Sequence, residues 1–256
     1  MKSTLIGIVV GFLLLGIAIL WSIDFQFGRF VWFFDLKALL IVLGGIVCAT
    51  FIAYPHNKVS GAFGSYVKAL SRNEISLEDY IQEIETLSAG AIEEDSRINP
   101  DEADEIGEAF LRDGLRMVVN KHPVDEVQRL MTERIKNTYH NDMLEAKVIR
   151  NMAKIAPAFG VLGTLLGLVM MMRSLDSSHP ELMTLLGTGM GTALLSIFYG
   201  VLLSNFLFTP VAVKIENRAA QRVVLLEIIM EGVVLLINEA PTGIIRDKLQ
   251  AFLAFK

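Results

Sequence analysis

The sequence has little of what catalysis or metal binding requires. It contains a single cysteine, which excludes an intramolecular disulfide. Its four histidines lack the spacing of metal ligands, and no nucleophile elbow, pair of catalytic carboxylates or cysteine–histidine set is present. The glycines between residues 187 and 191 have no following lysine and lie in an apolar segment, so they do not indicate a phosphate loop. We therefore expect no enzyme activity and no metal or organic cofactor.

Charge is also missing, from two long apolar segments. Residues 156–172 and 182–210 contain no Asp, Glu, Lys, Arg or His. A proton relay or coupled ion path usually needs an ionisable residue at membrane depth. If these segments line an ion path, the titrating carboxylate must come from another polypeptide.

The apolar residues are concentrated rather than spread. Of 256 residues 53% are hydrophobic, and they cluster in the runs 4–21, 36–54, 153–172 and 185–210. About 20 residues of helix cross a hydrocarbon core of about 30 Å. The first run lacks a cleavage site and is followed at once by the second, so it is not a typical signal peptide. No alternating apolar pattern indicates a sheet. The sequence predicts an all-α integral membrane protein with four transmembrane helices.

The domain organisation follows from these runs. We expect a first transmembrane hairpin over residues 1–54, a cytoplasmic helical domain over 55–152, a second hairpin over 153–210, and a cytoplasmic helix and tail over 211–256. Apolar residues at three- and four-residue steps predict helices over 77–87, 110–119 and 123–135, and residues 93–105 are predicted as a loop. The third and fourth spans should continue beyond the membrane as long helices.

Charge asymmetry predicts the orientation. Lysine and arginine are frequent in residues 55–152 and after Pro210, whereas the short connections 22–35 and 173–181 contain only Arg29 and Arg173. Positive residues favour the cytoplasmic side, so both termini and the long connection should be cytoplasmic. The net charge of −5 arises from acidic residues in the same parts, which argues against nucleic acid as a partner.

Small and hydroxyl residues recur along the last two spans. One helical face of the third span carries glycines with a threonine beside them, and the fourth span has a small or hydroxyl residue at every fourth position. These residues are Gly160, Gly163, Thr164 and Gly167, then Thr188, Thr192, Ser196, Gly200 and Ser204. Two interpretations remain open, namely tight helix packing and contact of the hydroxyls with water or an ion. Pro157 and Pro210 are either boundary prolines or hinges.

These residues resemble a known family. The stretches APAFGVLGTLLGLV and TALLSIFYGVLLSN, with Pro210 closing the segment, are similar to the MotA/TolQ/ExbB superfamily of ion-driven motor subunits. TolQ and ExbB have three spans, so the four-span layout is closest to the flagellar stator A subunits MotA and PomA. A TolQ/ExbB-like energiser, or another ion-driven rotary ring, is the alternative.

The resemblance implies a partner and a mechanism. It implies a pentamer in the bacterial inner membrane, surrounded by lipid, around two copies of a one-span B subunit that brings the ion-binding aspartate and binds peptidoglycan. Flow of H⁺ or Na⁺ would turn the ring, and its cytoplasmic domain would push on the flagellar C-ring rotor.

The resemblance also implies roles for particular residues. The residues expected along the ion path or the partner helix are Gly160, Gly163, Thr164, Gly167, Thr192, Ser196 and Ile197, and the conformational prolines are Pro157 and Pro210. Ile197 stands where the family has a threonine, which leaves sodium and proton both open. The Arg-rich torque motif is absent. The rotor-contact candidates are Glu94, Arg97, Glu102, Glu105, Arg112 and Arg116, in or beside an acidic segment that is either a solvated face or a contact for a basic rotor patch.

Overall fold

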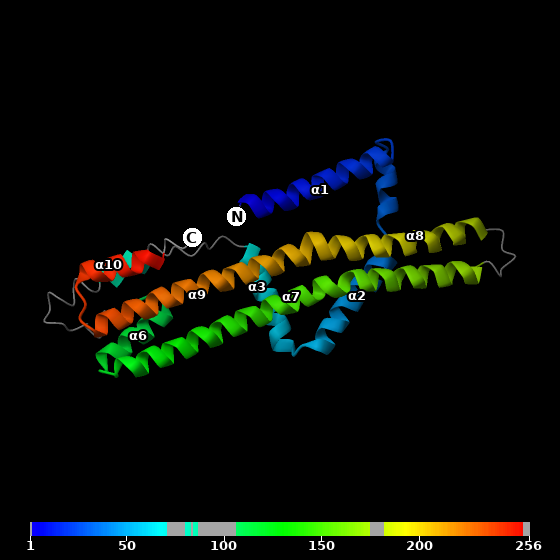
Figure 1. Ribbon diagram of the computed structural model, residues 1–256. Helices are drawn as coiled ribbons and strands as arrows, with labels where there is room; N and C mark the ends of the chain where they lie inside the picture. The colour runs from blue at the N-terminus through cyan, green and yellow to red at the C-terminus, as the bar shows by residue number, and fades with distance from the viewer. Residues whose placement is uncertain (1, 71–79, 83, 87–105, 175–181, 253–256) are drawn as a thin grey trace. The chain divides into compact units, whose positions relative to one another are not determined.

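A computed structural model of the chain describes residues 2–70, 80–82, 84–86, 106–174 and 182–252 (Figure 1). These residues form helices and connections without any strand, as the sequence predicts. The elements are α1 (Lys2–Ser22), the 3₁₀ helix η1 (Phe27–Phe33), α2 (Leu36–Ala53), α3 (His56–Leu70), α6 (Ala109–Val119), α7 (Val124–Ser174), α8 (Leu182–Leu202), the π-helix η2 (Leu203–Phe208), α9 (Thr209–Ile237) and α10 (Thr242–Ala251).

The chain divides into two compact units. The first comprises Met1–Arg72 and Leu144–Ile215, and the second comprises Asn73–Met143 and Glu216–Lys256. Helix α3 belongs to the first unit because it is fastened to α7: Ser65 Oγ donates a hydrogen bond to Glu145 Oε2, and Val59 and Ala62 are buried. Residues 55–72 thus pack with the apolar helices. The membrane and cytoplasmic limits of the domains stay predictions.

The predicted third and fourth spans belong to long helices, and how far these reach beyond the membrane stays a prediction. α7 is one helix of 51 residues, and its start together with α6 confirms the helices predicted over 123–135 and 110–119. The fourth span continues through η2 into α9, which ends at Ile237. Of the helix predicted over 77–87, residues 80–82 and 84–86 are helical, and the rest lies outside the described residues, as does the loop predicted over 93–105.

Within the first unit, α2 packs through one face. Asp35 caps its N-terminus by accepting hydrogen bonds from the backbone nitrogens of Lys37 and Ala38, at 2.8 and 3.3 Å. The buried residues follow at four-residue steps, namely Ala38, Val42, Ile46 and Thr50. This spacing defines a helical stripe that fits against the neighbouring helices.

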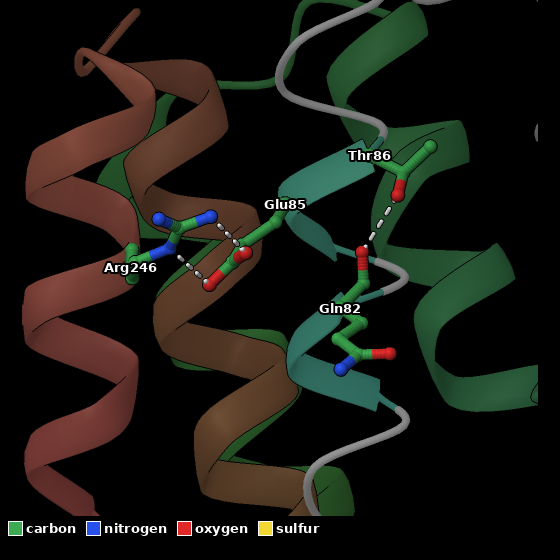
Figure 2. A network of polar contacts seen from close by, with 4 residues as sticks. All are labelled: Gln82, Glu85, Thr86 and Arg246. Atoms are coloured by element: carbon green, nitrogen blue, oxygen red, sulfur yellow. Dashed lines mark hydrogen bonds and ion pairs between the residues drawn. The ribbon is translucent and has the colours of Figure 1, made fainter.

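The second unit has its own apolar core. Helices α6, α7, α9 and α10 contribute fully buried side chains such as Leu111, Met131, Ile228 and Leu249. Figure 2 shows the polar contact at its edge: Arg246 donates to both carboxylate oxygens of Glu85, at 3.2 and 3.0 Å. This hydrogen bonding by Glu85 raises the pKa of the Arg246 guanidinium. The pair fastens α10 to the helical turn that contains Ile84.

Two helical segments in the described part of the chain are long and apolar enough to cross a membrane by length and composition. They are Gly28–Ala53 and Val124–Arg173, and Val9–Ser22 is a shorter apolar segment. The count of four spans stays a prediction.

Candidate functional site

The glycines of α7 lie in its contact with α8. Gly160, Gly163 and Gly167 are all buried, and α7 and α8 run side by side in Figure 1. A Cβ atom at Gly160 would lie 3.0 Å from the carbonyl oxygen of Ser196, and one at Gly167 would lie 2.7 Å from that of Gly189. Backbone atoms occupy the space that side chains would need at these two positions, and at Gly163 the Ser196 side chain occupies it. The packing interpretation therefore holds for these three glycines.

Two serines of the fourth-span stripe lie in the same interface. Ser196 is 0% exposed and donates its hydroxyl hydrogen to the carbonyl of Thr192 at 2.7 Å. Ser204 is 7% exposed and donates to the carbonyl of Ala153 at 2.7 Å. A four-residue step drifts about 40° around a helix, so the stripe does not keep to one face. In this chain Ser196 faces α7, rather than a surface that a partner helix could contact directly.

Thr164 is half-buried at the edge of this contact. Its hydroxyl lies 3.1 Å from the carbonyl of Gly160, one turn back, and 2.9 Å from the carbonyl of Ala193 on α8. A hydroxyl has one hydrogen, so these carbonyls share or alternate as acceptors. Thr164 thus links the two helices. The Ile197 side chain, 39% exposed, is more accessible.

The two prolines differ in where they lie along their helices, Pro157 within α7 and Pro210 at the start of α9. Pro157 lies inside α7, so it is not a boundary proline. Proline has no N–H, and the carbonyl four residues earlier, that of Ala153, loses its usual donor. The Ser204 hydroxyl donates to that same carbonyl and replaces the missing bond.

Pro210 follows a change of helix type. It is the second residue of α9 and comes directly after the π-helix η2, where the backbone nitrogen of Thr209 donates to the carbonyl of Ser204, five residues back. The wider π-turn accommodates a ring that would otherwise press on the preceding turn. A hinge role for either proline stays a prediction.

A hydrogen-bond network that the sequence analysis missed joins α8 to the start of α2. Thr192 Oγ1 donates to Asp35 Oδ2. The Tyr199 hydroxyl accepts from the backbone nitrogen of Asp35 at 2.9 Å and donates to the carbonyl of Phe33 at 2.7 Å. An aspartate just before an apolar run is a signal for a helix N-cap, and a tyrosine within such a run needs a partner for its hydroxyl. Both signals can be read from the sequence, but the sequence does not show that Asp35 and Tyr199 contact each other.

The rotor-contact candidates are only partly described. Arg112 donates to the carbonyl of Ile106 at 3.2 Å, and Arg116 lies exposed on α6. The acidic and basic candidates further back, Glu94, Arg97, Glu102 and Glu105, lie outside the described residues. In the described ranges there is no group of histidine, cysteine and acidic residues that could hold a metal ion.

Comparison with known proteins identifies the family. Residues 102–228 match the MotA/TolQ/ExbB proton channel family. The chemotaxis protein PomA of Vibrio alginolyticus is 30% identical over 231 residues, which cover 90% of this chain and 87% of that protein. The chain belongs to the MotA/TolQ/ExbB family. It is accordingly a component of an ion channel rather than an enzyme.

Solved structures show the same fold. C. jejuni MotAB superposes with a TM-score of 0.82 at 18% identity, covering 98% of this chain and 95% of that one. The flagellar MotAB stator complex of Bacillus subtilis superposes with a TM-score of 0.81 at 23% identity, covering 96% of this chain and 94% of that one. The similarity extends over nearly the whole chain, which includes the glycine-packed pair α7 and α8 as well as the helices of the second unit.

Proposed function

We propose that this MotA/TolQ/ExbB family member is a flagellar stator A subunit. With a B subunit it forms an inner-membrane channel for protons or sodium and converts ion flow into torque on the rotor. The observation that carries the proposal is the 30% identity to PomA over 87% of that protein. The glycine-packed, hydroxyl-bearing contact of α7 and α8 supports it, because this hairpin is built for close approach inside a membrane.

The proposed complex is a pentamer of this chain around two B subunits. Each B subunit brings one membrane helix with an aspartate and a peptidoglycan-binding domain. The absence of Asp, Glu, Lys, Arg and His from 156–172 and 182–210 supports an ion carrier supplied by the partner. Helices α1 and α2 carry many exposed apolar side chains, among them Leu14 at 61% and Ile52 at 87%, which suit lipid or neighbouring copies.

The side chains proposed to line the ion path are Thr164, Thr192 and Ile197. These side chains are more exposed than Ser196, which is fully buried. Ser196 and the α7 glycines pack α7 against α8 and so hold the lining side chains in place. The coupling ion is H⁺ or Na⁺. For the rotor, the C-ring contact is proposed at Arg112 and Arg116 of α6 and at the charged residues between 93 and 105.

Both termini and the second unit are proposed to lie in the cytoplasm, on the charge asymmetry of the connections. In a variant without Cys48, a cysteine at Ser178 should react with a membrane-impermeant thiol reagent in intact spheroplasts. A cysteine at Lys256 should react only after permeabilisation. The opposite labelling pattern would overturn the orientation.

Motor function should be recovered when this chain and its cognate B subunit are produced in cells that lack their own stators and carry the matching rotor. Rotation of tethered cells is the measurement. The variant Thr164→Val should slow rotation at unchanged membrane levels, because valine has the shape of threonine without its hydroxyl. Normal membrane levels of both subunits with no rotation and no ion flux would refute the proposed function.

A further inference from the structure

The Tyr199 hydroxyl is a buried bridge between two backbone groups. Tyr199 is 8% exposed, so its polar group depends on partners within the protein. It donates to the carbonyl of Phe33 and accepts from the nitrogen of Asp35, at 2.7 and 2.9 Å. These two groups flank the junction between η1 and α2. The Tyr199 hydroxyl therefore links the start of α2 to α8.

The same contact fixes the Asp35 carboxylate. Oδ1 is held by the cap bonds from Lys37 and Ala38, at 2.8 and 3.3 Å. The backbone nitrogen of Asp35 is held by Tyr199. With one oxygen and the main chain both anchored, Oδ2 has a defined place, and there it accepts the hydroxyl hydrogen of Thr192.

Thr192 and Tyr199 act from one side of α8, because residues seven apart lie on the same helical face. A threonine inside a helix ordinarily turns its hydroxyl hydrogen to the carbonyl one turn back, and Thr50 does so towards Ile46 at 2.7 Å. Thr192 donates to Asp35 instead. Its hydroxyl hydrogen is therefore occupied, and the group can offer only oxygen lone pairs to a third partner. Lone pairs suit a cation.

We propose that Tyr199 is a positioning residue for ion conduction: by bridging Phe33 and Asp35 it holds the Asp35 carboxylate on Thr192, and so keeps the Thr192 oxygen turned towards the coupling ion. The inference rests on the proposed stator function. Asp35 and Tyr199 act here through Thr192, and the cation meets the threonine oxygen.

The test measures rotation speed against coupling-ion concentration for the complex of this chain with its cognate B subunit. Tyr199→Phe keeps the ring and removes only the hydroxyl. It should raise the ion concentration for half-maximal speed about threefold to tenfold, the effect of one lost hydrogen bond. Thr192→Val should give a shift of similar size, and Thr192→Ser, which keeps the hydroxyl, should stay near wild type. The double variant Tyr199→Phe/Thr192→Val should shift no further than the larger single change.

Tyr139→Phe is the matched control, because it removes a hydroxyl from a side chain that is 42% exposed on α7. It should leave the half-maximal concentration unchanged. A Tyr199→Phe protein with an unchanged half-maximal concentration, or additive shifts in the double variant, would overturn the inference.

Should Tyr199→Phe fail to accumulate, Asp35→Asn takes its place. Its single acceptor oxygen cannot serve both the cap and Thr192, so it should give the same shift, and an unshifted value would count against the inference. Absence of ion-dependent rotation in the wild type would instead refute the proposed function.

Discussion

Replacing Gly200 with alanine should strongly destabilise the hairpin of α7 and α8. The added Cβ would lie 2.6 Å from the carbonyl oxygen of Ala156 and 3.1 Å from the Cα of Gly160. Both are backbone atoms, so no flexible side chain can move aside. The helices must separate, and every glycine contact between them loosens. Overpacking of this kind costs about 1–3 kcal/mol, even though alanine is the better helix former.

The measurement is the thermal unfolding midpoint of the protein purified in detergent, together with the amount of folded protein in the membrane. Gly191→Ala is the matched control. It lies on the same helix, and among the described residues no atom beyond its chain neighbours and the backbone of its own helical turns lies within 4 Å of the place that its new methyl carbon would take. Its midpoint should stay the same or rise slightly. Equal midpoints for the two variants would mean that α7 and α8 are not as close as the structure places them.

The purified subunit alone should pass no ions in liposomes, and adding the cognate B subunit should give flux driven by the ion gradient. Residues 156–172 and 182–210 contain no Asp, Glu, Lys, Arg or His. The glycine contact between α7 and α8 is closed by backbone atoms, as at Gly167 and Gly189. Without a carrier, a cation would have to leave water with little to replace its hydration.

A pH-sensitive or sodium-sensitive dye inside the liposomes reports the flux. A B subunit whose membrane carboxylate has been changed to the amide is the control, because it restores the complex without the titrating group. It should conduct as little as the subunit alone. Substantial flux from the subunit alone would show that the ion path is complete within this chain.

The helices were predictable from local pattern, whereas their cross-connections were not. Periodicity in residues 110–119 and 123–135 was enough for α6 and the start of α7. The helical face shared by Gly160, Gly163 and Gly167 followed from 3.6 residues per turn. The burial of each small or hydroxyl residue of the fourth span depends on where α7 packs against it. The full burial of Ser196 could therefore not be deduced from the sequence.

The contact of Thr192 with Asp35 joins residues 157 positions apart, and no local rule reports such a pair. The cap formed by Asp35 is local and could have been predicted. Similarly, Pro157 is a recognised helix breaker, yet α7 continues through it. The reason lies on the facing helix, in the Ser204 hydroxyl, and it becomes visible only when both helices are in place.

The Ser204 hydroxyl replaces the hydrogen bond that Pro157 cannot donate, so the effects of substitutions at positions 157 and 204 depend on each other. While Pro157 is present, loss of the Ser204 hydroxyl leaves the buried carbonyl of Ala153 without a donor, at a cost of about 1–3 kcal/mol. With alanine at position 157, the helix supplies its own donor, and the serine becomes dispensable. Changes at the two sites are therefore tolerated in one order only: the proline can be lost first, whereas the serine cannot.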